Sequence, residues 1–459
     1  MIINDLTFKG KNGRDDFGRE KIAEKIINLL TSDINISPLV IDGDWGSGKT
    51  EFCHKLINKI IETESIYRTI YIDSFQADHA DNPLMTILSA VINLFPEGTK
   101  KTTLLEKSIP VLRYGLATIG KAVVSHALKQ NTDEIIDGFD ERLQEVADKA
   151  IDASVQILLK DHEKAQENIK ALQKTLESLA EDSPIIVFID ELDRCRPDYA
   201  VDILEVIKHT LNVPNVYFVL ITNTHQLKAA INHRYGNQVN AQRYLDKFVK
   251  FSFSLPNFIP GIKRYGESKV FASPEHFSNL VLNSNTLKET KLIDKHHISH
   301  EFTKNFIELA KISLREVETF LLHLEIYQRL TNGLQSNIST GYLLLRIFGV
   351  YIYCFSPDTV RSIQNNNADA NHIANIFELN GLPDKIPDHH EWSHVKDFGI
   401  ILARNCKINK DMYLSDNQSL QEYWDNTSRR FFSDNWGVTP DDLYATVRET
   451  IDNLRLGGK

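Results

Sequence analysis

The segment from Gly43 to Thr50 has the residue types and spacing of a phosphate-binding loop. It matches the pattern G-x-x-x-x-G-K-T. Glycines let successive backbone N–H groups turn towards one anion, and the positive end of a following helix adds to their attraction. In this pattern the lysine reaches the β- and γ-phosphates and the threonine hydroxyl binds Mg²⁺. The predicted site for a magnesium-bound nucleoside triphosphate consists of Gly43, Asp44, Trp45, Gly46, Ser47, Gly48, Lys49, Thr50 and the following Glu51.

A second chemical feature is the carboxylate pair Asp190 and Glu191, which follows the apolar run Ile185–Ile189. If this run is a strand of a parallel sheet, Asp190 lies at the carboxyl edge, where it can hold Mg²⁺ through water. Glu191 is then suited to orient or deprotonate the attacking water. Acidic residues also cap helices, but the phosphate-binding loop upstream favours the catalytic interpretation. The two motifs together predict hydrolysis of the nucleotide.

Five short apolar or β-branched runs, bounded by turn residues, predict the strands that position these motifs. Helical patterns separate the runs, so we expect a parallel sheet with right-handed crossovers. The loop follows the first strand and the carboxylates follow the third. The predicted strands are Leu39–Asp42, Thr69–Asp73, Ile185–Asp190, Val216–Thr222 and Phe248–Phe253.

The chain has 459 residues, which is too long for one ordinary core. We expect an α/β fold of the P-loop NTPase type, with its core in two parts, 1–99 and 181–256. A helical insertion would occupy residues 100–180, either as a rod or as a hairpin. Its charges form a solvated face or a partner-binding coiled coil. An all-helical C-terminal region would follow, divided into a lid, 257–335, and a further part, 336–459.

Composition argues against several classes of protein. The net charge is −10, and we see no stripe of basic and aromatic residues, so neither a nucleic-acid coat nor a DNA-translocating motor is indicated. No segment offers the roughly twenty uninterrupted apolar residues of a membrane span, and the N-terminus lacks the layout of a signal peptide. The four cysteines lie far apart without a C-x-x-C pair. We therefore expect a cytoplasmic protein without membrane segments.

The stretch His390–His394 matches H-E-x-x-H, the pattern in which two histidines of a metalloprotease bind zinc. A capping box explains it better, because Asp388 can be an N-cap and Glu391 follows three residues later. No further zinc-binding continuation follows. We expect zinc neither here nor at the histidine cluster Lys295–His300.

At the level of whole motifs, the sequence resembles the KAP family of P-loop NTPases, in the additional-strand, catalytic-glutamate division. The resemblance covers about residues 12 to 330 and leaves 336–459 uncovered. It implies ATP as the nucleotide, Mg²⁺, an AAA-like lid and, by analogy only, bacterial defence against phage. The residues that carry it are the loop with Trp45, Ile189-Asp-Glu-Leu-Asp-Arg-Cys-Arg-Pro197, Asp16-Phe-Gly-Arg-Glu20 and Tyr244-Leu-Asp-Lys247.

The sequence departs from this family at two places. Many members carry membrane spans in the insertion, and this chain shows none there. The family usually has an Asp-Arg pair after the fourth strand, where this chain has Ile221-Thr-Asn-Thr224. Asn223 is either a polar sensor of the γ-phosphate or the cap of a helix that begins near His225.

Hydrolysis in this division needs a cation near the γ-phosphate. Arg315 lies in a segment, Ser313–Glu318, that resembles the second-sensor motif of AAA-like lids and would act within its own subunit; the alternative is a surface ion pair. Arg194 or Arg196 would instead reach the site of a neighbouring subunit, and Arg243 is a further candidate. These arginines motivate the expectation of a homo-oligomer.

Arg19 is expected near the adenine or ribose of the nucleotide, or else in a charge pair with Asp16 or Glu20 at a helix start.

We also expect a protein partner or effector, which would bind through the insertion or residues 336–459. The alternative to a cycling ATPase is a scaffold that binds the nucleotide without hydrolysing it.

Overall fold

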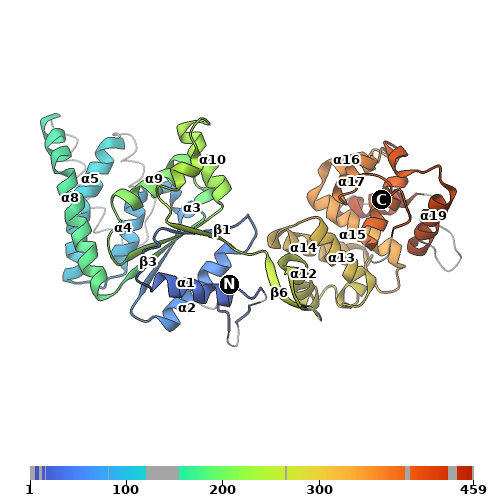
Figure 1. Ribbon diagram of the computed structural model, residues 1–459, viewed down its shortest axis with the longest axis horizontal. Coiled ribbons are helices and arrows are strands. Elements are labelled where there is room, and N and C mark those ends of the chain that lie inside the picture. The colour runs from blue at the N-terminus through green and yellow to red at the C-terminus, as the bar shows by residue number, and fades with distance from the viewer. Residues whose placement is uncertain are drawn as a thin grey trace. The chain divides into compact units, whose positions relative to one another are not determined.

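A computed structural model of the chain describes residues 6–9, 13–15, 17–80, 82–119, 155–263, 266–387, 393–432 and 442–456. The chain forms two compact units, Met1–Pro256 and Asn257–Lys459. The first contains a parallel sheet with its helices, and the second is mainly helical (Figure 1).

The sheet of the first unit has five parallel strands in the order β2-β3-β4-β1-β5. This arrangement confirms the predicted parallel sheet. The last strand begins at Phe251 rather than at Phe248, because Phe248 belongs to a helical turn in which its N–H bonds to Leu245 O at 2.9 Å. The strands are β1 Leu39–Asp42, β2 Arg68–Asp73, β3 Ile185–Asp190, β4 Val216–Thr222 and β5 Phe251–Ser254.

Helices cover both faces of this sheet (Figure 1). Helices α1 (Glu20–Leu30) and α2 (Lys49–Thr63) pack on one face, against Ile186 and Phe188 of β3. Helices of the other face contact Ile185, Val187 and Ile189. Because β3 is buried on both faces, it is a continuous apolar run. The helices of the second face include α4 Pro83–Asn93, α9 Pro197–His209, α10 Thr224–Tyr235 and the short α11 Ala241–Leu245.

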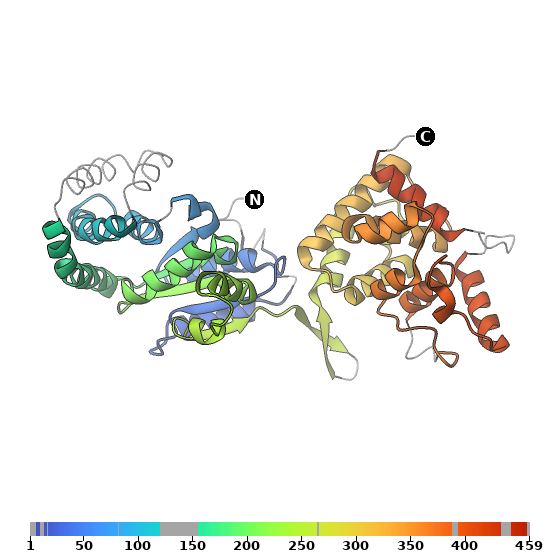
Figure 2. The same ribbon diagram turned by 90° about the horizontal axis from the view of Figure 1, so that it is seen from above.

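The described part of the insertion is helical, as predicted. It consists of α5 (Thr99–Ile119) and α8 (Val155–Asp182), which lie side by side in both views (Figures 1 and 2). Leu104 of α5 and Leu172 of α8 are fully buried in the same hydrophobic cluster as the sheet. Part of each of these two helices therefore belongs to the hydrophobic core of the first unit. Residues 120–154 lie outside the described ranges.

The second unit begins with an antiparallel hairpin of β6 (Phe258–Lys263) and β7 (Gly266–Phe271), which the sequence did not predict. In the sequence, Pro260 and Gly261 interrupt the apolar pattern of this segment, and such a pattern is typical of a loop. The rings of Phe258 and Phe271 pair across the hairpin at 4.7 Å. The helices that follow agree with the prediction: α12 Ala272–Asn283, α13 Ile298–Leu309, α14 Leu314–Thr331, α15 Thr340–Phe355, α16 Pro357–Gln364, α17 Ala370–Ile376, α18 His394–Arg404, α19 Gln418–Phe432 and α20 Leu443–Leu454.

One hydrophobic core holds these helices together, and it crosses the predicted boundary between residues 335 and 336. Phe306 of α13 packs against Phe348 and Tyr351 of α15, with ring centroids at 6.4 and 4.6 Å. The predicted lid and the predicted further part thus share buried aromatic contacts and form one unit. None of the helices in the described ranges combines the length and apolar character that crossing a bilayer requires.

Candidate nucleotide-binding site

The phosphate-binding loop connects β1 to α2, as its sequence predicts. Gly46 and Gly48 have φ angles of 77° and 80°, a region that glycine enters without steric cost. Gly48 is also the N-cap of α2. Lys49 Nζ donates to Gly43 O at 2.6 Å and to Asp44 O at 3.0 Å. The loop therefore curls around the lysine side chain at the carboxyl edge of the sheet.

Asp190 lies at the end of β3 and is 1% exposed. Its carboxylate accepts bonds from Glu191 N at 2.7 Å and from Tyr71 Oη at 3.2 Å, and it also contacts the Thr50 hydroxyl. Burial raises the pKa of Asp190, and these hydrogen bonds offset part of that effect. Thr50 and Asp190 therefore come together from distant parts of the sequence, and their oxygens are the ligand type that Mg²⁺ prefers.

Glu191 follows Asp190 with a φ of 58°, in a left-handed conformation that is uncommon for a residue other than glycine. Its Oε1 pairs with the guanidinium of Arg194 at 2.8 Å. Arg194, predicted to serve a neighbouring subunit, thus contacts the proposed catalytic carboxylate of its own chain. Arg196 Nε bonds to Asp78 Oδ1 at 3.0 Å, which anchors the turn to the segment after β2.

The electrostatic surroundings of Lys49 are acidic. Burial lowers the pKa of Lys49, whereas nearby carboxylates act in the opposite direction; in order of effect they are Asp193, Asp190, Asp42 and Asp44. These carboxylates favour the charged ammonium that a phosphate-binding lysine needs. They also form an environment in which a cation is well accommodated.

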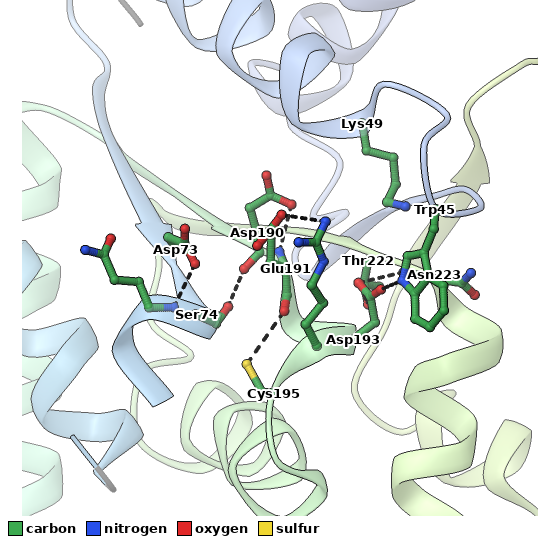
Figure 3. Close-up of polar contacts among 12 residues, drawn as sticks. Trp45, Lys49, Asp73, Ser74, Asp190, Glu191, Asp193, Cys195, Thr222 and Asn223 are labelled. Carbon is green, nitrogen blue, oxygen red and sulfur yellow. Dashed lines mark hydrogen bonds and ion pairs between the residues drawn. The ribbon is translucent and has the colours of Figure 1, made fainter. Parts of the chain in front are cut away.

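Asp193 is a residue of this site that the sequence reasoning missed. It lies in the short 3-10 helix η3 (Leu192–Arg194), and its Oδ2 accepts a bond from Trp45 Nε1 at 2.5 Å (Figure 3). Its Oδ1 accepts from Asn223 N at 3.0 Å and Thr222 Oγ1 at 3.2 Å. The sequence places Asp193 two positions after Glu191, but an acid in a helical turn resembles an ordinary surface charge.

Asn223 caps a helix. Its side-chain oxygen accepts from His225 N at 3.0 Å and from Gln226 N at 3.3 Å, at the start of α10. The capping interpretation is confirmed. A role as sensor of the γ-phosphate stays a prediction, although Asn223 does follow β4 at the same sheet edge as Glu191 (Figure 3).

Arg19 is buried, with 5% of its surface exposed. Its guanidinium donates to Ser47 O at 2.9 Å and to Pro256 O at 3.2 Å. Burial lowers its pKa to about 10, while Glu51 and then Asp15 act in the opposite direction. The charge-pair alternative with Glu20 is wrong, because the carboxylate of Glu20 pairs with lysines. Asp16 lies outside the described residues.

A cleft beside Gly48 continues from the phosphate-binding loop. Glu51, predicted to bind the nucleotide, pairs there with Lys55 at 2.7 Å, and Lys55 Nζ also donates to Arg14 O at 2.5 Å. Aromatic rings and charged groups thus lie next to the start of α2. The cleft is lined by Phe8, Arg14, Asp15, Phe17, Arg19, Gly48, Glu51, Phe52 and Lys55.

Arg315 and the histidine motifs belong to the second unit. Arg315 is exposed on α14, whose first turn carries a capping box between Ser313 and Glu316. Its second-sensor role stays a prediction. His390 and Glu391 lie outside the described residues. His300 bonds to Leu292 O at 2.5 Å and to Ser278 Oγ at 2.9 Å, so both ring nitrogens already have partners.

The parallel sheet, the glycine loop after β1 and the carboxylates after β3 define the class of P-loop NTPases. A family model described as "KAP family P-loop domain" matches residues 19–331, and the chain belongs to this family.

The chain is also similar to individual known proteins. The Phage T7 exclusion protein of Escherichia coli (strain K12) is 24% identical over 257 residues, which are 53% of this chain and 33% of that protein. The chain therefore spans about a third of this relative's length. Among solved structures, the Aeropyrum pernix ORC2 protein in ADPNP–ADP complexes is 12% identical, with coverage of 96% and 93% and a TM-score of 0.34.

Proposed function

We propose that this protein binds ATP with Mg²⁺ and hydrolyses it, and that the nucleotide cycle controls oligomer assembly or partner engagement. Lys49 and the loop amides bind the phosphates, and Thr50 and Asp190 hold the metal ion. Glu191 orients or deprotonates the attacking water. When bound, Mg²⁺ neutralises charge on the phosphates.

The observation that supports this proposal most strongly is that Thr50, at the start of α2, and Asp190, at the end of β3, lie at the same carboxyl edge of one parallel sheet. A hydroxyl at the start of α2 and a buried carboxylate at the end of β3 give two oxygen ligands beside Lys49. Glu191 is the next residue, at the same sheet edge. The binding groups and the proposed base therefore lie at one edge of the sheet, which supports a role for them in attack on a terminal phosphate.

A second candidate function is a nucleotide-dependent scaffold that does not hydrolyse ATP. The ion pair of Arg194 with Glu191 favours it, because the pair engages the carboxylate that would otherwise orient the attacking water. As long as the pair persists, the Glu191 carboxylate is turned to Arg194 and the bound triphosphate would be long-lived.

The comparison of Lys49→Ala with Glu191→Gln tests both functions. Binding is measured by calorimetry with Mg²⁺ and ATP, turnover by phosphate release and assembly by light scattering. For the ATPase, Glu191→Gln should bind ATP but lose about 100-fold or more in turnover, and Lys49→Ala should lose binding.

A scaffold would keep its cellular activity in Glu191→Gln and lose it in Lys49→Ala. ATP binding by Lys49→Ala at wild-type affinity would contradict both functions. Asp198→Asn is a matched control, because Asp198 is an exposed acid on α9 outside the proposed site.

For the biological role we propose defence against phage in a bacterial cytoplasm. The support is the family and the similarity to a protein named for phage exclusion. Phage challenge of cells that carry wild-type protein or Lys49→Ala tests this role, and equal protection by both would contradict it.

We also propose that a partner or effector binds the insertion or residues 336–459. Deleting 336–459 would remove part of a shared core, so surface substitutions are the better test. Met412→Asp is suitable because Met412 is 61% exposed. Loss of partner capture with an unchanged melting temperature would support the proposal.

A further inference from the structure

The carboxylate of Asp193 joins three parts of the proposed site. Asp193 itself belongs to the turn that begins with Glu191. One oxygen receives the indole N–H of Trp45 from the phosphate-binding loop, and the other receives the backbone N–H of Asn223 and the hydroxyl of Thr222 from the end of β4 (Figure 3). The phosphate-binding loop, the turn that begins with Glu191 and the end of β4 therefore all contact the Asp193 side chain or carry it.

The chemistry of these bonds makes the carboxylate hard to replace. An ionised carboxylate accepts bonds on both oxygens, and such charge-assisted bonds are stronger than neutral ones. An asparagine has one oxygen and one NH₂ group, so in either orientation it presents a donor to a donor. The indole N–H is the single polar group of Trp45. Its bond to Asp193 means that Trp45 contributes a tether to the loop instead of a ligand to phosphate.

We propose that Asp193 is a positioning residue. Through Trp45 it holds the phosphate-binding loop in a fixed position relative to the turn of Glu191 and the end of β4. This inference rests on the proposed ATPase function. Lys49 follows Trp45 in the loop, Glu191 precedes Asp193 in the turn, and Asn223 follows β4. The tether therefore fixes Lys49, Glu191 and Asn223, the groups proposed to act at the γ-phosphate, relative to one another.

A purely structural surface contact is the alternative, because the Trp45 side chain is half exposed and exposed polar contacts often contribute little. The two interpretations differ in what they change. A positioning role affects turnover more than substrate binding, because misalignment is felt in the transition state. Loss of a purely structural contact would change the melting temperature, and it would not lower kcat more than it affects KM.

The test uses Asp193→Asn, Trp45→Phe and their combination in the full chain, with phosphate release measured over a range of ATP concentrations. Each single variant should lower kcat about tenfold and change KM less than about threefold. The double variant should be no slower than the slower single variant, because both substitutions break one link. Asp198→Asn should behave as wild type. Tryptophan emission should shift in Asp193→Asn, because the Trp45 indole N–H loses its acceptor. The part of the emission change on addition of ATP that comes from Trp45 should be absent in Trp45→Phe.

Additive losses in the double variant, or wild-type kcat in Asp193→Asn, would overturn the proposal and leave the ATPase function intact. A wild-type protein without Lys49-dependent phosphate release would overturn both. Melting temperatures guard against misfolding, and Trp45→Phe at a half-exposed position tests the same link independently of Asp193.

Discussion

Gly43→Ala gives the sharpest test of the loop geometry. A methyl group at this position would lie 2.8 Å from Ser47 Oγ and 3.4 Å from two carbons of the Lys49 side chain. Ser47 is 5% exposed, so its hydroxyl has little room to move aside. The φ angle of Gly43 is not in the left-handed region, and alanine is therefore compatible with the backbone. The whole cost comes from the new contact.

The size of this cost follows from overpacking, which costs about 1–3 kcal/mol in a tight site. If the loop must distort to bind phosphate, this energy appears as weaker binding. At about 1.4 kcal/mol for each factor of ten, the Kd of a slowly hydrolysed ATP analogue in the presence of Mg²⁺ should rise about 5- to 140-fold. Calorimetric titration measures the change, and the melting temperature without nucleotide controls for folding.

Removal of the contacting atom should restore binding. Ser47→Ala deletes the hydroxyl, whose Oγ has no hydrogen-bond partner among the described residues. The combination of Gly43→Ala with Ser47→Ala should therefore bind the nucleotide more tightly than Gly43→Ala, and Ser47→Ala alone gives the baseline. If the combination binds as weakly as Gly43→Ala, or if Gly43→Ala binds as wild type, the steric argument is refuted.

Two further predictions concern stability. Burial raises the pKa of Asp190, so the folded chain holds a proton on this carboxyl more tightly than the unfolded chain, and stability falls as pH rises through the raised pKa. Asp190→Asn should thus raise the melting temperature in metal-free buffer at neutral pH, and raise it less at acidic pH. The same variant should lose phosphate release. A lower melting temperature of Asp190→Asn at neutral pH would contradict this prediction. In the second unit, Gly341→Ala would place a methyl group against the backbone carbonyl of Phe431 and should cost about 3 kcal/mol or more. Urea denaturation should show this unit unfolding earlier while ATP binding persists, and simultaneous loss of both would count against two independent units.

The motifs of the site were predictable because they are local. The glycine pattern from Gly43 to Thr50 determines its own backbone, and the run that ends at Asp190 is continuously apolar because both faces of β3 are covered. Alternating strands and helices then restrict the topology to a parallel sheet. The positions of Lys49, Thr50, Asp190 and Glu191 at one edge follow from this pattern.

The partners of individual side chains were not predictable. Arg194 and Arg196 are near neighbours in sequence, yet one contacts Glu191 and the other Asp78. Asp193 gains its importance from Trp45, which lies far from it in sequence. The pairs Arg196–Asp78 and Trp45–Asp193 depend on where separate elements meet, and the spacing of residues along the chain does not reveal that.

The amino-acid sequence by itself therefore determined the class of fold, the phosphate-binding loop and the carboxylate pair, because backbone preference and hydrophobic periodicity act over short distances. Only the tertiary structure decided that Asp193 links loop and β4, that Arg19 binds the carbonyls of Ser47 and Pro256, and that the helices on both sides of residue 335 share one core. These outcomes depend on the packing of elements far apart in sequence, where burial and hydrogen-bond satisfaction are settled jointly rather than residue by residue.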